Sequence, residues 1–231
     1  MIVDLNCDLG EGCPHDAELL PLITTANVAC GWHAGGADQA LMIIELAAKC
    51  GVRVGAHPSF PDREQFGRRE MVRTERQILE DCVYQIGALA GLAKVVRMEL
   101  THVKPHGALY NMACRDDAYA RPVVHAAEIF NLPIVGLPGS RLESACHGKL
   151  VFIPEGYADR RYRLDGSLVP RSEPGAFVES AAEAVQHVLS LLQLRRIRTI
   201  CVHGDNPQAV SFVRELRSAL VQRGVEIRAF A

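Results

Sequence analysis

The stretch IVDLNCDLGEG, residues 2–12, shows how this chain is built: a short β-rich run leads directly into polar side chains. Residues 2–6 form the run, and Asn6, Asp8 and Glu11 mark its end. Further short β-rich runs alternate with longer stretches of helical period, at 25–30, 52–56, 98–103, 133–137, 150–153, 198–202 and 225–229. Such alternation is typical of βα units around a parallel sheet. It predicts an α/β fold, a (β/α) barrel of seven or eight mainly parallel strands.

Polar clusters follow most of the later runs as well. Barrel enzymes build their active sites from the loops at the C-terminal ends of the strands, so these clusters are expected to meet at one rim. Besides Asn6, Asp8 and Glu11, the rim would receive His33, His57, Lys104, His106, Glu155, His203 and Asp205. Six separate segments thus predict a single shared active site.

The stretches between the runs carry helix signals. Thr74 and Gln77 have the spacing of a capping box, and an apolar face follows at Ile78, Cys82, Ile86 and Leu89. A second stripe is formed by Val178, Ala182, Val185, Leu189 and Leu192. For the last helix we expect Asp205 or Asn206 as N-cap and Pro207 in the first turn, then inward Val210, Val213, Leu216 and Leu220, with Gly224 at the end. The Gly/Pro/charge-rich stretch 57–70 is predicted to be a long loop that lines the site.

Composition limits the possible functions. The 231 residues are 48% hydrophobic and 23% charged, which favours one catalytic domain over 1–231. A net charge of -2 and a pI near 6.5 argue against a nucleic-acid partner. The first eleven residues include acids but no basic segment, and no apolar run is long enough for a membrane, so we expect a cytoplasmic protein. The eight cysteines include no CxxC pair and are interpreted as reduced core residues.

Several candidate side chains have both a functional and a structural interpretation. Asp205 could serve only as a helix N-cap, and His203 could simply bond a backbone group. Lys104 precedes Pro105, which restricts Lys104 to extended backbone and favours a place in the site. Arg68 and Arg160 could be solvated charges, but an Arg fork on a loop suits a substrate carboxylate or phosphate.

Eight sequence blocks carry a family resemblance: DLNCDLGEG (4–12), ANVACGWHAG (26–35), GAHPSFPD (55–62), FGRREM (66–71), HVKPHGALYN (102–111), ADRRY (158–162), GSLVPRS (166–172) and CVHGDNP (201–207). In this order and spacing the chain resembles the LamB/YcsF family, the A subunit of bacterial 5-oxoprolinase, from residue 2 to about residue 224. Two positions depart from the family pattern. The family usually has an aromatic residue after GEG and Asp-Pro after HAG, where this chain has Cys13-Pro14 and Gly36-Ala37.

The resemblance implies a barrel of the glycoside hydrolase/deacetylase type. It also implies ATP-dependent hydrolysis of 5-oxo-L-proline (pyroglutamate) to L-glutamate, carried out with partner subunits B and C. The sequence has no GxxxxGK[ST] phosphate loop, so we expect the ATP site to lie on, or be shared with, the partner subunits.

Two catalytic hypotheses remain open at this point. In the first, Asp8 or His57 activates water, Lys104 and His106 stabilise the oxyanion or protonate the leaving group, and Arg68 or Arg160 holds the substrate carboxylate. The remaining rim residues, Asn6, Glu11, His33, Glu155, His203 and Asp205, would then contact substrate. The alternative is a metal-dependent deacetylase or carbohydrate hydrolase in which Asp8, His33 and His57 bind a divalent ion. A non-catalytic subunit that presents substrate to partners is a third interpretation.

Overall fold

The computed structural model describes residues 1–231 except 179, 195–196, 205–206 and 231. Its centre is a closed barrel of parallel strands: β1 (Ile2–Leu9), β2 (Thr25–Ala29), β3 (Arg53–His57), β4 (Leu100–Val103), β5 (Ile134–Gly136), β6 (Phe152–Tyr157) and β7 (Thr199–Val202). The ring closes because β1 pairs with both β2 and β7, with Asn6 opposite Thr25 and Asp4 opposite Thr199. An eighth strand, β8 (Glu226–Ile227), pairs with Ile2 and Val3 at the start of β1. The predicted barrel is confirmed, and seven strands close it.

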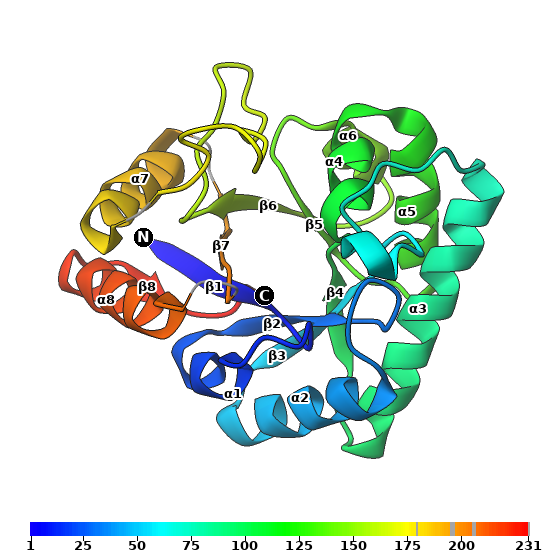
Figure 1. Ribbon diagram of the computed structural model, residues 1–231, viewed down its shortest axis with the longest axis horizontal. Coiled ribbons are helices and arrows are strands. Elements are labelled where there is room, and N and C mark those ends of the chain that lie inside the picture. The colour runs from blue at the N-terminus through cyan, green and yellow to red at the C-terminus, as the bar shows by residue number, and fades with distance from the viewer. Residues whose placement is uncertain (179, 195–196, 205–206, 231) are drawn as a thin grey trace.

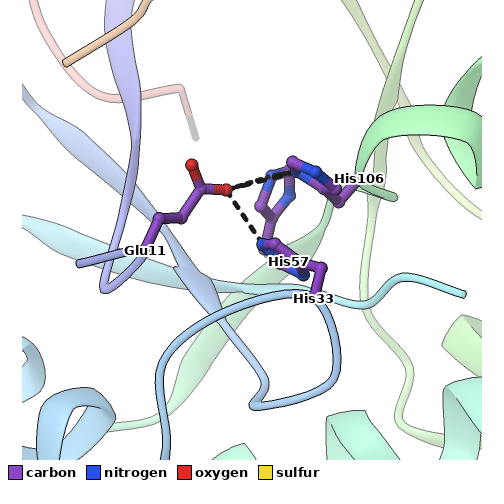
Figure 2. Close-up of side chains that lie close together, drawn as sticks. All are labelled: Glu11, His33, His57 and His106. Atoms are coloured by element: carbon purple, nitrogen blue, oxygen red, sulfur yellow. Dashed lines mark hydrogen bonds and ion pairs between the residues drawn. The ribbon is translucent and has the colours of Figure 1, made fainter. Parts of the chain in front are cut away.

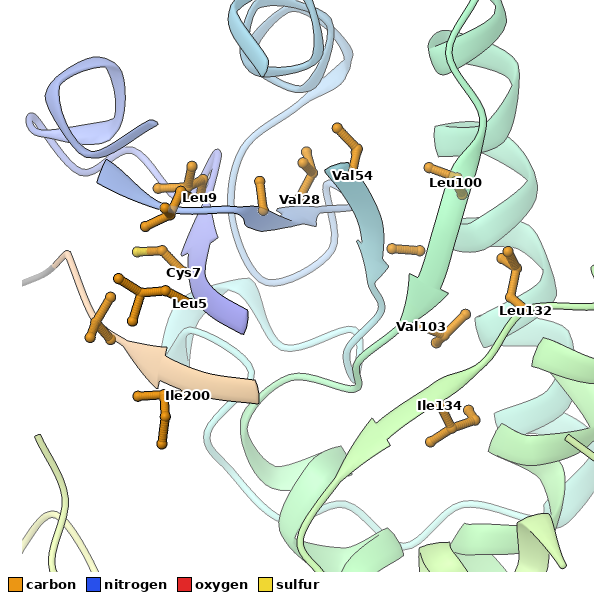
Figure 3. Close-up of a cluster of buried hydrophobic side chains, with 14 of the residues drawn as sticks. Leu5, Cys7, Leu9, Val28, Val54, Leu100, Val103, Leu132, Ile134 and Ile200 are labelled. Atoms are coloured by element: carbon orange, nitrogen blue, oxygen red, sulfur yellow. The ribbon is translucent and has the colours of Figure 1, made fainter. Parts of the chain in front are cut away.

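Helices surround the strands, as Figure 1 shows: α1 (Asp16–Leu19), α2 (Ala37–Cys50), α3 (Glu75–Val95), α4 (Gly107–Arg115), α5 (Asp117–Ile129), α6 (Arg141–Cys146), α7 (Ala181–Leu194) and α8 (Ala209–Gln222), with short 3-10 turns η1 (Leu20–Leu22) and η2 (Arg63–Gln65). Figure 3 shows part of the main apolar core. The strand residues in it include Leu5, Cys7, Val28, Val54, Val103 and Ile200. The same core contains the inner faces of the helices, so the hydrophobic layer lies between barrel and helices.

The first expected helix start is confirmed at α3. Thr74 is the N-cap, its side chain accepts from the Gln77 amide, and the Gln77 side chain accepts in return from the Thr74 amide. The predicted inward face of this helix is buried at Ile78, Cys82, Ile86 and Leu89.

The stripe predicted for α7 is confirmed only in part: Val185 is buried, but Ala182 is exposed. Its buried positions are Ala184, Val185, Val188 and Leu191. Val178 is buried but precedes the helix, where its amide donates to the carbonyl of Asp159. Counting the helical period from Val178 therefore shifted the predicted face, and Leu189 and Leu192 are only half-buried.

The last helix begins later than expected. Gln208 is its N-cap, and Pro207 lies in the preceding turn. The alternative N-caps Asp205 and Asn206 fall outside the described residues. Val213, Leu216 and Leu220 are buried, Val210 is half-buried, and Gly224 follows the helix with φ +78°.

The barrel interior is polar, which the sequence analysis did not anticipate. TIM-type barrels are filled mainly by branched apolar side chains. Here alternate residues of β1 reach inward: Asp4 accepts from Thr24, Thr25 and Thr199, and Asn6 donates to Glu155 and accepts from Asn27. Asp4 is 1% exposed, and burial, partly offset by the hydroxyl donors, raises its pKa to about 6. A hydrogen-bonded column thus takes the place of part of the apolar filling, next to a small separate apolar cluster of Val135, Ile153 and Phe230.

Strand bounds also change the position of two candidates. Glu155 lies inside β6 and not after it, and Asn6 lies in the middle of β1. Two long loops continue past the C-terminal strand ends. One covers 58–74, and the other covers 158–178, where isolated bridges join Arg160 to Phe177 and Tyr162 to Leu168. A helix with the length and apolar character needed to cross a membrane is not found in the described part of the chain.

Candidate active site

A cavity of about 840 Å³ opens at the C-terminal ends of the strands. Its lining brings together most of the side chains that the sequence placed there: Asp8, Glu11, His57, Arg68, Lys104, His106, Arg160 and His203. Three other candidates are buried but not part of the lining, namely Asn6, His33 and Glu155. Asp205 falls outside the described residues.

The floor of the cavity is organised around the ammonium of Lys104. This side chain is 1% exposed, and its Nζ lies 3.0 Å from Asp8 Oδ1 and 2.8 Å from Glu155 Oε1. It also lies 3.3 Å from Asn6 Oδ1 and 3.1 Å from Cys201 Sγ. Burial alone would lower the pKa of Lys104, but the neighbouring anionic groups, Asp8 first, hold it well above its usual value. Lys104 is therefore a permanent buried cation whose three N–H groups face four acceptors.

Asp8 is the carboxylate that joins this floor to the cavity. Its Oδ1 accepts from Lys104 and, at 2.8 Å, from the amide of Asn27, while Oδ2 lies 3.3 Å from His57 Nε2. Burial would raise the pKa of Asp8, but the charges of His57 and Lys104 hold it well below its usual value. An ionised carboxylate therefore faces the cavity at neutral pH.

Glu155 has a different position. Its Oε1 accepts from Lys104 and Asn6, and its Oε2 accepts from the Tyr110 hydroxyl at 3.0 Å. Both oxygens are occupied by protein donors. Its evident role is to balance the charge of Lys104 and to fix its position.

A cluster of imidazoles borders the same cavity (Figure 2). Glu11 Oε1 lies 2.9 Å from His33 Nε2, 3.2 Å from His106 Nδ1 and 3.6 Å from His57 Nε2. The rings of His33 and His106 are stacked with centroids 3.8 Å apart. Burial lowers the pKa of His33 to about 3 despite the hydrogen bond with Glu11. The cluster is dense, and among the side chains drawn only Glu11 is acidic.

Hydrogen bonds to three backbone carbonyls of the loop 58–74 hold it against this cluster. The His106 amide donates to Pro58 O at 2.8 Å, the Ala108 amide donates to Gly67 O at 2.9 Å, and His106 Nε2 donates to Phe66 O at 2.9 Å. Gly107 sits between these contacts with φ +54°, and a Cβ there would lie 2.5 Å from Gly67 O. The loop and the start of α4 therefore need glycine at this position.

We expect Gly107→Ala to lower the free energy of unfolding by about 1–3 kcal/mol, because the added methyl must displace the loop backbone. The matched control is Gly91→Ala in the interior of α3, where nothing lies within 4 Å of the added Cβ. That change should stabilise the protein by about 0.5–1 kcal/mol. Urea unfolding of both variants measures the difference, and equal effects would argue against the close approach.

Arginines and His203 also line the cavity. The guanidinium of Arg68 lies over the Phe66 ring at 4.9 Å, and that of Arg160 lies 5.3 Å from the Phe177 ring. Arg160 is 6% exposed, its Nη2 donates to Val169 O, and its Nε has no hydrogen-bond partner within the described chain. His203 Nδ1 lies 2.7 Å from Asp159 Oδ2.

Several residues of this site were not predicted from the sequence. They include Asn27, Tyr110, Asp159, Arg163, Arg171 and Cys201, which line the cavity or contact its side chains. Arg163 and Arg171 stand in the 158–178 loop, beside the arginine that was predicted. All of these unpredicted residues except Arg163 lie inside the eight sequence blocks, so a signal for the other five existed.

The model of the LamB/YcsF family matches residues 3–231 of this chain. The chain belongs to the LamB/YcsF family. Among solved structures, a lactam utilization protein from Thermus thermophilus is similar to it with 41% identity and a TM-score of 0.93, and 100% of each chain is covered. The family resemblance carried by the eight sequence blocks is thereby confirmed.

More distant structures share only the fold with this LamB/YcsF chain. A family 4 carbohydrate esterase from Streptomyces lividans in complex with acetate has 12% identity and a TM-score of 0.57, covering 100% of this chain and 93% of its own. The catalytic domain of a peptidoglycan N-acetylglucosamine deacetylase from Eubacterium rectale has 14% identity and a TM-score of 0.57, with coverages of 100% and 88%. These neighbours confirm the deacetylase-like barrel.

Proposed function

We propose that this LamB/YcsF protein is the A subunit of a 5-oxoprolinase, which hydrolyses 5-oxo-L-proline to L-glutamate together with subunits B and C at the expense of ATP. The observation that carries the proposal is the pairing of the ionised Asp8 and buried Lys104 with arginines at one cavity. 5-Oxoproline has a cyclic amide and a carboxylate. The Asp8–Lys104 pair suits hydrolysis of the amide, and the arginines suit binding of the carboxylate. The full-length similarity to a lactam utilization protein supports a lactam as substrate.

In the proposed reaction, water adds to the lactam carbonyl carbon, the ring C–N bond breaks, and the nitrogen gains a proton. We assign water activation to Asp8 in preference to His57, since His57 Nε2 already faces His106 and Glu11 at 3.0 and 3.6 Å. The four acceptors around Lys104 favour a role in holding Asp8 in place and keeping it ionised. This assignment replaces direct oxyanion contact by Lys104.

The leaving nitrogen needs a proton donor, and we assign it to His203. Its Nδ1 is held by Asp159 at 2.7 Å, which fixes the ring and leaves Nε2 for proton transfer. His203, Asp8 and Cys201 each present an atom within 4.8 Å of the other two. His203 is therefore near the proposed base. Arg160 and Arg68 would hold the substrate carboxylate, because a guanidinium pairs with a carboxylate through two parallel N–H donors.

The ATP site would lie on, or be shared with, the partner subunits. A five-membered lactam resists hydrolysis, and transfer of a phosphoryl group from ATP to its amide oxygen would make the carbonyl carbon a better electrophile. Addition of water and cleavage of the C–N bond would then give an acyl phosphate, and a second water would release phosphate and leave L-glutamate. The sequence has no GxxxxGK[ST] loop with which to bind the nucleotide itself. The cavity of about 840 Å³ and its arginines leave room for a phosphorylated lactam.

The isolated chain should therefore release little or no glutamate from 5-oxoproline. When it is mixed with candidate B and C subunits and ATP, the chain should release glutamate with turnover. Omission of ATP should stop the reaction. Glutamate is quantified by chromatography in all four combinations of partners and nucleotide. Robust hydrolysis by the isolated chain would contradict the proposed division of labour.

The second candidate, a metal-dependent deacetylase or carbohydrate hydrolase, is favoured by the histidine cluster on a deacetylase-like barrel. It predicts acetate release from N-acetylated sugars by the isolated, metal-loaded chain. This assay uses no partner subunit, so it separates the two functions directly.

A further inference from the structure

Four side chains from separate segments converge on one point beside the cavity. Glu11 follows β1, His33 follows β2, His57 ends β3 and His106 precedes α4. Each offers one ligand atom, and these four atoms all lie within 4.8 Å of one another. The side chains are between 0% and 10% exposed.

The hydrogen bonds fix which imidazole nitrogens carry protons. His57 Nδ1 lies 2.7 Å from Lys104 O, and His106 Nε2 lies 2.9 Å from Phe66 O. A carbonyl oxygen only accepts, so each of these nitrogens must be the N–H of its ring. In a neutral ring the opposite nitrogen then carries a lone pair.

The two remaining nitrogens face each other. His57 Nε2 and His106 Nδ1 are 3.0 Å apart, and both lie near Glu11 Oε1. Two lone pairs and a carboxylate oxygen cannot share this space without a positive charge among them. A proton on one ring would meet the need of that one pair. A metal ion would use the lone pairs of His57 and His106 and the Glu11 carboxylate, and it would take a third imidazole once His33 Nε2 no longer donates to Glu11.

The donor set matches a transition-metal site. Three imidazole nitrogens and one carboxylate oxygen are common ligands of Zn²⁺ and related ions. Metal-bound histidines usually donate their other N–H to a backbone carbonyl or carboxylate, which orients the ring. His57 and His106 both have such a carbonyl acceptor here. Two of the three imidazoles are therefore oriented as metal ligands usually are. His33 has no acceptor for its Nδ1 among the described residues and is stacked on His106, so its ring would have to rotate to direct its lone pair at the same ion.

A second group of potential metal ligands lies nearby, but a protein cation already contacts it. Asp8, Cys201 and His203 also lie within 4.8 Å of one another. However, Lys104 Nζ lies 3.0 Å from Asp8 Oδ1 and 3.1 Å from Cys201 Sγ, so a cation already occupies that position. The same contact engages Oδ1 of Asp8, which the sequence had suggested as a metal ligand together with His33 and His57, while its Oδ2 lies 3.3 Å from His57 Nε2.

We propose that Glu11, His33, His57 and His106 bind one divalent transition-metal ion of the zinc type. The site lies beside Asp8 and borders the cavity through Glu11, His57 and His106. Binding of the ion needs neither substrate nor partner subunits, so this inference stands apart from the proposed reaction.

The test uses the full chain without a histidine tag, freed of metal by dialysis against a chelator. Calorimetric titration with Zn²⁺ should give one site per chain, and Co²⁺ should give the intense visible absorption of a four-coordinate ion. His33→Ala and Glu11→Gln should each weaken Zn²⁺ binding by at least about 100-fold, since even loss of an outer partner of a ligand costs 10–100-fold. His125→Ala, at an exposed histidine of α5, is the matched control and should bind like the wild type.

The Co²⁺ spectrum of the wild type decides the question even if a ligand variant fails to fold. Stoichiometric binding with a four-coordinate spectrum supports the site. Absence of stoichiometric binding, or the pale spectrum of a six-coordinate surface ion, would overturn it and leave a shared proton as the charge within the cluster. Folded ligand variants that bind like His125→Ala would also overturn it.

Discussion

Lys104→Met is expected to destabilise the fold as well as to abolish activity. Removal of one partner of a buried ion pair leaves an uncompensated charge and costs about 3–5 kcal/mol. Here the change would leave both Asp8 and Glu155 without their shared cation at less than 10% exposure. Thermal and urea unfolding should therefore report a large loss of stability.

Two variants serve as controls for this result. Lys49→Met, at an exposed lysine near the end of α2, should change stability by no more than about 0.5 kcal/mol. Adding Glu155→Gln to Lys104→Met should restore part of the lost stability, since it removes one of the two unpaired charges. If Lys104→Met unfolds like the wild type and lowers only kcat, Lys104 acts on the reacting oxygen and not as a counter-charge.

Asp8→Asn is expected to have the opposite profile: a large loss of turnover with little loss of stability. The asparagine keeps an oxygen for Lys104 and Asn27, and Lys104 keeps Glu155 as its counter-charge. The ionised carboxylate that faces the cavity is lost, and general-base catalysis is worth about 10²–10⁴-fold. We therefore expect kcat of the reconstituted complex to fall by at least about 100-fold.

The melting temperature of Asp8→Asn, measured alongside the kinetics, separates catalysis from structure. A fall as large as that of Lys104→Met would mean that Asp8 mainly holds the barrel interior together. A rise in KM at constant kcat would instead make Asp8 a substrate-binding group.

The barrel was predictable because the alternation of β-rich runs and helical stretches depends on local sequence. Its polar interior was not anticipated, although β1 carries the signal. In IVDLNCDL, residues 2–9, the polar Asp4, Asn6 and Asp8 alternate with apolar residues. A barrel strand covered by helices usually has a near-continuous apolar pattern, so this alternation already indicated a second, polar face.

The site was predicted better in position than in role. Strand ends located Asp8, His57, Lys104 and His106 correctly at one cavity, since that rule depends only on topology. Roles depend on which partners meet, and Glu155 meets Tyr110 and Lys104, which lie far earlier in the chain. Such pairings follow from barrel closure and strand register, which a single sequence does not reveal.

The most direct test of the account measures glutamate released from 5-oxoproline by subunits B and C with ATP. This chain is omitted, added as wild type, or added as folded Asp8→Asn. The account predicts release only with the wild type, and the same background rate in the other two mixtures. Release at the wild-type rate with Asp8→Asn would contradict it, because the chain would then present substrate or assemble the complex without performing the hydrolysis.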